Sequence, residues 1–192
     1  MSIELKTGFV GSGKSYAATK DGVTVADARL GKRWVIANFP IKDKPPFLAR
    51  FRKGAKAKKP RWIYKSNEEL TVKFLIEKSI EMGWNKINTS SALVIIDEAG
   101  IKFNSRSWNS PDRLEWIQFL TQSRKFGYDI VFITQDGKMI DKQIRALCEF
   151  ETQYKKLNNM VYFKFLSLLG ITLFAGVSFW NGVKHTKGQL SL

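Results

Sequence analysis

The chain has 192 residues, 44% of them hydrophobic and 13% aromatic, which suits one compact domain with a packed core. Its single cysteine, Cys148, excludes an internal disulfide and a cysteine-based zinc site, and its single histidine, His185, excludes a histidine-rich metal centre. Lysine and arginine number 32 against 17 acidic residues, a net charge of +15, so we expect an anionic partner: nucleic acid, an acidic protein or an anionic membrane surface.

Hydrophobic patterning in the first 40 residues predicts a strand, a helix and a second strand. The first strand contains Ile3 and Leu5 and breaks at Gly8, and a helix is expected over Lys14–Leu30. Trp34–Phe39 is predicted as the second strand because its run ends at a proline.

The segment Lys42–Lys65 differs in composition from the rest of the chain. It holds ten lysines and arginines against one acid, Asp43, and its prolines and Gly54 argue against one continuous helix. Four aromatic residues are interleaved with these cations: Phe47, Phe51, Trp62 and Tyr64. We therefore expect a basic excursion from the core that contacts single-stranded DNA or acidic lipid headgroups. The alternative is a solvated loop whose charge only aids solubility.

Three further elements extend the predicted core. Ser66 and Glu69 form a capping-box pattern, which predicts a helix from there to about Met82. Ala92–Ile96 and Ile130–Thr134 are predicted as buried strands, because runs without polar alternation are typical of parallel strands covered on both faces.

Between these two strands, Ser110-Pro111 opens another predicted helix. Its core-facing residues are expected to be Leu114, Ile117, Phe119 and Leu120. Strands that alternate with helices in this way predict an α/β fold, a mostly parallel, doubly wound sheet sandwiched by helices.

The apolar segment 161–183 has two interpretations. Lys164 is its only charge, and 23 residues would be long enough to cross a bilayer as a helix. The preferred interpretation is two strands, Val161–Phe165 and Ile171–Trp180, because both are rich in aromatic and β-branched residues. We therefore treat residues 1–192 as a single domain whose C-terminal strands extend the sheet, with the membrane helix as the alternative.

The run GFVGSGKS at Gly8–Ser15 matches the phosphate-binding P-loop pattern G-x-x-x-x-G-K-[ST]. In such a loop, glycines let successive backbone N–H groups point at phosphate oxygens, the lysine reaches the β- and γ-phosphates, and the final hydroxyl binds Mg²⁺. The expected nucleotide-binding residues are Gly8, Gly11, Ser12, Gly13, Lys14 and Ser15. The strand, loop and helix around the motif are the context that it requires, so we expect ATP and Mg²⁺ as cofactors.

Polar residues follow two of the predicted strands. Asp97 and Glu98 come directly after the first, where Asp97 would hold Mg²⁺ and Glu98 would deprotonate the attacking water. Gln135 follows the second, where its amide would contact the γ-phosphate or the water. The alternative for each is a solvated strand end. The adjacent acids favour a hydrolysing ATPase over a kinase.

Together these motifs resemble the zonular occludens toxin (Zot) family, which includes the gene I assembly proteins of filamentous phages. The likeness rests on Gly8–Ser15, on VIIDEA at 94–99, and on LTQSRKFGYDI at 120–130, ITQ at 133–135 and IDKQIR at 140–145. It implies an FtsK–HerA-like ATPase core that powers filamentous phage assembly and extrusion at the inner membrane. The roles it implies are nucleotide and Mg²⁺ binding for Lys14 and Ser15, hydrolysis for Asp97 and Glu98, sensing for Gln135, and catalysis for Arg124 or Arg145.

An arginine of this kind often acts across a subunit boundary, and we expect 192 residues to form one domain without a second to supply it. We therefore expect a ring-shaped homo-oligomer, with a hexamer favoured, and phage coat or assembly proteins and single-stranded DNA as partners. Residues 1–7 lack the apolar run of a secretion signal, so we expect the protein at the cytoplasmic face of the host inner membrane or in the cytoplasm.

Other functions compete with the assembly motor. One is a DNA translocation or packaging ATPase, and another is a nucleotide-gated binding module with slow turnover. A third, a toxin acting on host junctions, finds no support in the residues themselves.

Overall fold

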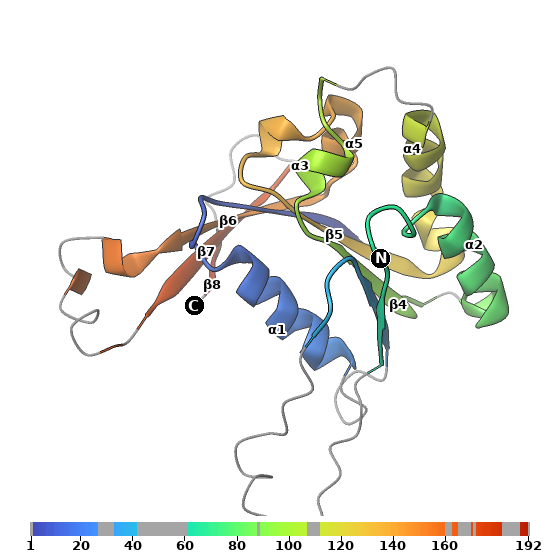
Figure 1. Cartoon of the computed structure of the whole chain (residues 1–192), viewed down its shortest axis with the longest axis horizontal. Helices are drawn as coiled ribbons and strands as arrows, with labels where there is room; N and C mark the ends of the chain where they lie inside the picture. The colour runs from blue at the N-terminus through green and yellow to red at the C-terminus, as the bar shows by residue number, and fades with distance from the viewer. Residues whose placement is uncertain are drawn as a thin grey trace, which may run out of the picture.

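The computed structural model describes residues 2–26, 33–41, 61–87, 89–106, 112–159, 163–164, 170, 172–181 and 189–191. Within these ranges an eight-stranded sheet runs through the molecule with helices on both faces (Figure 1). The strands are β1 (Ile3–Thr7), β2 (Trp34–Ala37), β3 (Trp62–Tyr64), β4 (Ala92–Ile96), β5 (Tyr128–Ile133), β6 (Phe150–Lys156), β7 (Phe174–Trp180) and β8 (Gln189–Ser191). The α-helices are α1 (Lys14–Ala26), α2 (Val72–Glu81), α3 (Ala99–Lys102), α4 (Asp112–Gln122) and α5 (Lys142–Ala146). Short 3₁₀ turns are η2 (Trp84–Lys86), η3 (Ser123–Phe126), η4 (Gly137–Met139) and η5 (Leu157–Asn159).

The strand order is β3-β2-β4-β5-β1-β6-β7-β8. All neighbours from β3 to β6 are parallel, while β7 and β8 add to the sheet antiparallel. The prediction of a mostly parallel sheet extended by C-terminal strands is therefore confirmed. Because β1, β4 and β5 are parallel neighbours in the middle, their carboxyl ends meet at one edge of the sheet.

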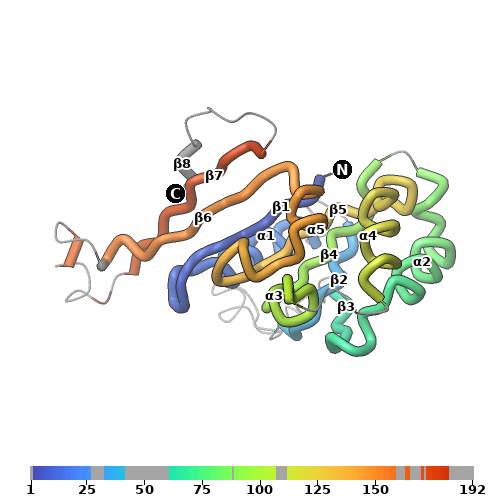
Figure 2. Tube along the Cα trace, turned by 90° about the horizontal axis from the view of Figure 1, so that it is seen from above, coloured from blue at the N-terminus to red at the C-terminus, as the bar shows by residue number. Residues whose placement is uncertain are grey.

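The two faces of the sheet carry different helices. One core cluster joins Ala18 and Ala26 of α1 to Leu93 and Ile95 of β4. The other cluster lies on the opposite face and gathers side chains from α2, α3, α4 and α5. Figure 2 shows α2 and α4 at the end of the molecule with β2 and β3, and the β6–β7 pair at the other end. A strand such as β4 is buried on both sides, which explains its continuous apolar sequence.

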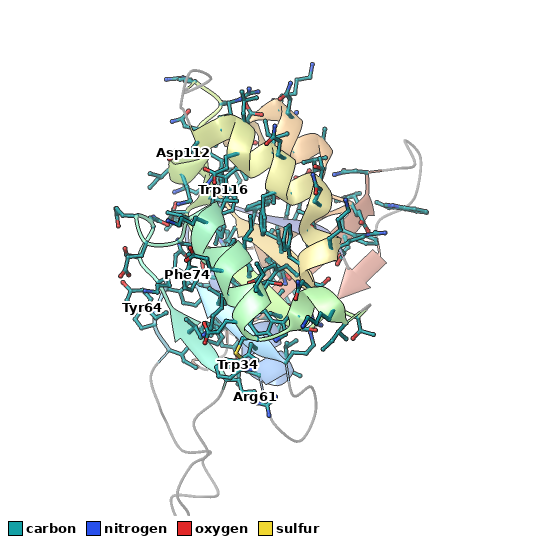
Figure 3. The ribbon with its side chains drawn as sticks, turned by 90° about the vertical axis from the view of Figure 1, so that its right-hand side faces the viewer. Trp34, Arg61, Tyr64, Phe74, Asp112 and Trp116 are labelled. Carbon is teal, nitrogen blue, oxygen red and sulfur yellow. The ribbon has the colours of Figure 1, made fainter. Side chains whose placement is uncertain are left out.

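The inward face of α4 differs from the prediction at one position. Phe119 and Leu120 are buried and Ile117 is partly buried, as expected, but Leu114 is 63% exposed. Trp116, which is only 4% exposed, is the buried residue of this turn instead. It lies on α4 beside α2 (Figure 3). The helix begins at Asp112, so positions 116, 119 and 120 share its inner face at the helical spacing of three and four residues.

The start of α2 was predicted too early. The capping box does form, since the N–H of Ser66 donates to Glu69 Oε2 at 3.1 Å and the N–H of Glu69 donates to Ser66 Oγ at 3.3 Å. It closes only a single turn, because Thr71 then adopts an extended backbone with φ −101° and ψ 161°. Thr71 caps the real helix by accepting a 3.2 Å hydrogen bond from the N–H of Phe74.

The C-terminal segment is partly described. Phe174–Trp180 forms β7, so a single membrane helix over 161–183, the alternative interpretation, is wrong. The first of the two expected strands is also not found where it is described, because Phe163 and Lys164 have helical backbone. β7 pairs with β8 and with β6, a strand that the sequence analysis did not predict. In the parts of the chain that the structure describes, no helix combines the length and apolarity needed to cross a membrane.

Two other expectations fall partly outside the described residues. The helix predicted over Lys14–Leu30 is described only to Ala26. Most of the basic excursion, residues 42–60, lies outside, but its last part, Trp62–Tyr64, is the edge strand β3 and so belongs to the sheet.

Candidate active site

The P-loop connects the end of β1 to the start of α1. Its backbone curls through left-handed conformations at Gly11, with φ +75°, and Gly13, with φ +91°. Gly8 is held between two neighbours: a Cβ there would lie 2.5 Å from Ser12 Oγ and 2.6 Å from the carbonyl oxygen of Tyr154. The loop is fixed internally, since the N–H of Ser12 donates to the carbonyl of Phe9 at 3.1 Å. This glycine spacing therefore builds the curled loop that the motif predicts.

Two side chains of the loop, Lys14 and Ser12, are suited to bind a phosphate. Lys14 is 7% exposed, and its Nζ lies 3.5 Å from the carbonyl oxygen of Phe9. In the described part of the chain, no carboxylate lies within ion-pair distance of that ammonium group. Ser12 Oγ is buried and has no hydrogen-bond partner among the described residues. A buried hydroxyl without a partner is costly, and a phosphate oxygen would satisfy it.

Asp97 and Glu98 follow β4 at the same edge. Asp97 is half-buried and Glu98 is exposed. Glu98 has φ +52° and ψ +39°, the left-handed region, and it is the one non-glycine residue with positive φ in the described ranges. Its N–H donates to Asp97 Oδ1 at 2.9 Å, and its carbonyl accepts from Ile101 at 2.8 Å. A left-handed conformation costs about 1–2 kcal/mol for such a residue, and outliers of this kind cluster at functional sites.

Asn38 is a positioning residue to which the sequence analysis gave no role. It follows β2, next to β4 in the sheet. Its Oδ1 accepts from the N–H of Asp97 at 2.7 Å, and its Nδ2 donates to the carbonyl of Asp97 at 2.8 Å. The same Nδ2 donates to Asn67 Oδ1 at 2.7 Å, which ties Asp97 to the turn before α2. The available signal was an amide placed directly after an apolar strand.

Gln135 lies between these two groups. β5 runs between β4 and β1, and the carbonyl of Gln135 accepts a 3.1 Å hydrogen bond from the N–H of Gly8. The Gln135 side chain is exposed at the edge. The structure thus brings the P-loop, Asp97, Glu98 and Gln135 together, while their chemical roles stay predictions.

The structure places the two candidate arginines differently. Arg124 lies in η3, which precedes β5 and so sits at the opposite edge, where its Nη2 pairs with Glu149 Oε1 at 2.9 Å. Arg145 lies in α5, and its Cδ is 3.6 Å from where a Cβ of Gly137 would be. The neighbouring Leu5 belongs to the core cluster on the face away from α1. Arg124 therefore lies away from the site of its own chain, whereas Arg145 lies beside the turn that follows Gln135.

The oxygen donors at the edge suit a magnesium ion. Ser15 offers a hydroxyl and Asp97 a carboxylate, and Mg²⁺ binds through such hard oxygens together with water and substrate phosphates. Within the described residues, the Ser12 hydroxyl without a hydrogen-bond partner and the Lys14 ammonium without a carboxylate partner fit the accompanying phosphates.

Comparison with known proteins gives consistent matches. The family model described as zonular occludens toxin (Zot) matches residues 2–177. The Gene 1 protein of Enterobacteria phage fd is 29% identical over 163 residues, 83% of this chain and 44% of the relative. The chain thus spans less than half the length of that relative.

Two solved structures share the fold. The N-terminal domain of zonular occludens toxin from Neisseria meningitidis aligns with a TM-score of 0.55 at 22% identity, over 93% of this chain and 83% of that domain. The genome packaging NTPase of Sulfolobus turreted icosahedral virus 2, in complex with ATP-gammaS, aligns with a TM-score of 0.56 at 15% identity, over 98% of this chain and 96% of that protein.

Proposed function

Because the chain belongs to the zonular occludens toxin (Zot) family, we propose that it binds and hydrolyses ATP to power filamentous phage assembly and extrusion at the host inner membrane. The observation that carries the proposal is the meeting of three motifs at one sheet edge: the P-loop, the Asp97-Glu98 pair and Gln135. The phage relative, named Gene 1 protein, supports the assembly role.

The phosphate-binding groups act first. Backbone N–H groups of the loop, the Ser12 hydroxyl and the Lys14 ammonium would neutralise the triphosphate. Ser15 and Asp97 would hold Mg²⁺, which when bound offsets charge on the β- and γ-phosphates. Together these groups would hold the terminal phosphate close to the carboxyl ends of β4 and β5.

Glu98 then serves as the general base. Its carboxylate is exposed at the edge, and the backbone that carries it is fixed by Asp97 and by the first turn of α3. A positioned base contributes about 10²–10⁴-fold to such a reaction. Gln135 would contact the terminal phosphate or the water. The carbonyl of Gln135 accepts a hydrogen bond from Gly8, so loss of that phosphate would change the position of the end of β5 as well as that of the loop.

The proposed partners rest on the net charge of the chain and on the positions of the two candidate arginines. Because Arg124 lies away from its own site, it would act on a neighbour in a ring-shaped assembly, for which we propose a hexamer, with Arg145 as the second candidate. A net charge of +15 favours an anionic surface, and we propose single-stranded DNA or acidic lipid headgroups, alongside phage coat or assembly proteins. The same charge favours a second candidate function, DNA translocation or packaging. Both functions place the protein at the cytoplasmic face of the host inner membrane or in the cytoplasm.

The test compares ATP binding and hydrolysis of wild type, Lys14→Ala and Glu98→Gln, each with and without single-stranded DNA. We expect Lys14→Ala to lose ATP binding, and Glu98→Gln to bind ATP but hydrolyse it at least about 10²-fold more slowly. Glu77→Gln is the matched control, since Glu77 is an exposed glutamate on α2. Wild-type turnover in Glu98→Gln would exclude Glu98 as the base, and strong stimulation by DNA would favour translocation.

A further inference from the structure

A recess of about 410 Å³ opens beside the P-loop, along the flank of α1 that faces β6 and β7. In the core cluster on this face, α1 packs on β2, β4 and β5, whereas residues of β1, β6 and β7 line the recess. The recess runs from Gly13 of the loop down to Asp21, two turns along the helix. It therefore shares Gly13 with the phosphate-binding loop, while its other lining residues have no part in the proposed hydrolysis.

The mouth of the recess is aromatic. Tyr16, 68% exposed, comes directly after Ser15, and its ring centroid lies 6.3 Å from that of Phe174 at an interplanar angle of 36°. Phe174 also packs on the loop itself, because a Cβ on Gly13 would lie 2.5 Å from its ring. Two rings thus stand next to the residues expected to bind the phosphates.

The floor of the recess is polar, with Lys6 and Thr152 buried, Glu4 and Tyr154 partly buried and Asp21 exposed. Lys6, 2% exposed, donates from Nζ to Asp21 and, at 3.4 Å, to the hydroxyl of Tyr154, and Glu4 lies 3.9 Å away. Thr152 donates to Glu4 Oε1 at 2.8 Å. Burial lowers the pKa of the Lys6 ammonium, but Glu4 and the hydrogen bond to Asp21 outweigh it and leave the pKa raised. The floor therefore combines a fixed cation with carboxylate and hydroxyl acceptors.

We infer that this recess receives the purine base and ribose of the nucleotide whose phosphates occupy the P-loop, with the base stacked on Tyr16 and Phe174. The inference rests on the proposed function, and deepens it by naming the residues that bind the rest of the nucleotide. The flat base can stack on the two aromatic rings at the mouth. Its polar edge and the two ribose hydroxyls can form hydrogen bonds with the polar side chains of the floor. The order along the chain agrees, because Tyr16 follows the last phosphate-binding residue.

The geometry also fixes the direction in which the nucleotide lies. The acids that act on the terminal phosphate follow β4, on one side of β1, whereas the recess lies over β6 and β7, on the other side. A nucleotide that spans the loop with its γ-phosphate toward Asp97 therefore extends its base toward Phe174.

The test measures calorimetric dissociation constants for ATP and for inorganic tripolyphosphate, both with Mg²⁺, on wild type, Tyr16→Ala and Phe174→Leu. Tyr64→Ala is the matched control, since Tyr64 is a half-exposed tyrosine on β3, at the opposite edge of the sheet (Figure 3). Stacking on an aromatic ring is typically worth about tenfold or more in affinity. We expect both recess variants to bind ATP about tenfold more weakly, with tripolyphosphate affinity unchanged, and Tyr64→Ala to bind both as wild type does.

Because Tyr16 is exposed, its truncation should leave the fold intact even if Phe174→Leu destabilises β7. Unchanged ATP affinity in Tyr16→Ala, or an equal loss for ATP and tripolyphosphate, would overturn the inference and leave ATP hydrolysis standing. Equal affinity of wild type for the two ligands would do the same, because the base would then contribute nothing. A wild-type protein that binds neither would refute the proposed function, and this inference with it.

Discussion

Replacing Asn38 with alanine tests how the catalytic acids are held. The side chain makes three hydrogen bonds: two with the backbone of Asp97, at 2.7 and 2.8 Å, and one with Asn67, at 2.7 Å. Each hydrogen bond contributes about 1 kcal/mol net, so Asn38→Ala should lower the free energy of unfolding by about 3 kcal/mol. Asn67→Ala removes only the third bond and should cost about 1 kcal/mol.

The catalytic effect should be separable from the loss of stability. Without the amide, the peptide between Asp97 and Glu98 loses its lateral anchor on β2, while the P-loop stays as it is. Small displacements of a catalytic group can cost up to about 10²-fold in rate. We therefore expect kcat to fall at least about tenfold in Asn38→Ala with ATP affinity preserved, and to stay near wild type in Asn67→Ala.

Urea unfolding followed by circular dichroism gives the stabilities, and steady-state ATP hydrolysis under conditions where each variant is folded gives kcat. The reasoning would be refuted if Asn38→Ala and Asn67→Ala lost the same stability, since the two backbone bonds would then contribute nothing. It would also be refuted by a wild-type kcat in Asn38→Ala.

Three further predictions concern other parts of the molecule. Although burial raises the pKa of Asp129, hydrogen bonds from Ser90 and Arg33 outweigh it and hold the pKa below its usual value. The stability it contributes is therefore present above about pH 4 and lost as the pH falls through the folded pKa, so Asp129→Asn should be less stable at pH 7 and show a shallower acid dependence in urea unfolding. Burial, with Glu151 adding to it, raises the pKa of Cys148 to about 12, so the native thiol should resist iodoacetamide until the protein unfolds, and rapid labelling would contradict its burial. Mixing Lys14→Ala subunits with Arg124→Ala or Arg145→Ala subunits should restore part of the ATPase activity for the arginine that acts across the boundary, whereas no recovery with either would argue against a shared site.

The P-loop could be predicted because its information is local. Glycine spacing, the lysine and the following hydroxyl lie within eight residues, and the flanking strand and helix follow from simple apolar patterns. The meeting of Asp97 and Gln135 with that loop was also predictable, since parallel strands deliver their carboxyl ends to one edge. These motifs needed no knowledge of contacts between distant residues.

Elements whose stability comes from neighbours were harder to predict. β6 has the sequence FETQYKK, with little apolar periodicity, and it exists as a strand because β1 and β7 pair with it on both sides. The start of α2 was misplaced because two capping patterns follow each other, and the sequence does not show that the second prevails. Tertiary packing decides both cases.

The recess and the role of Asn38 could not be read from the sequence for a related reason. The recess takes its walls from α1, β1, β6 and β7, which are separated by up to about 170 residues of chain. Asn38 and Asp97 are 59 residues apart and meet only because β2 and β4 are neighbours. Such juxtapositions depend on strand order, which the pattern of strands and helices leaves open.

The two margins of the sheet share a feature with a practical consequence. β3 at one side and β8 at the other are each three residues long, whereas β6 and β7 inside have seven. A long, flat outer strand would present a row of unpaired N–H and C=O groups on which another molecule could build intermolecular sheet and start aggregation. Short margins limit that template. Engineered insertions that lengthen β3 or β8 should be avoided for the same reason.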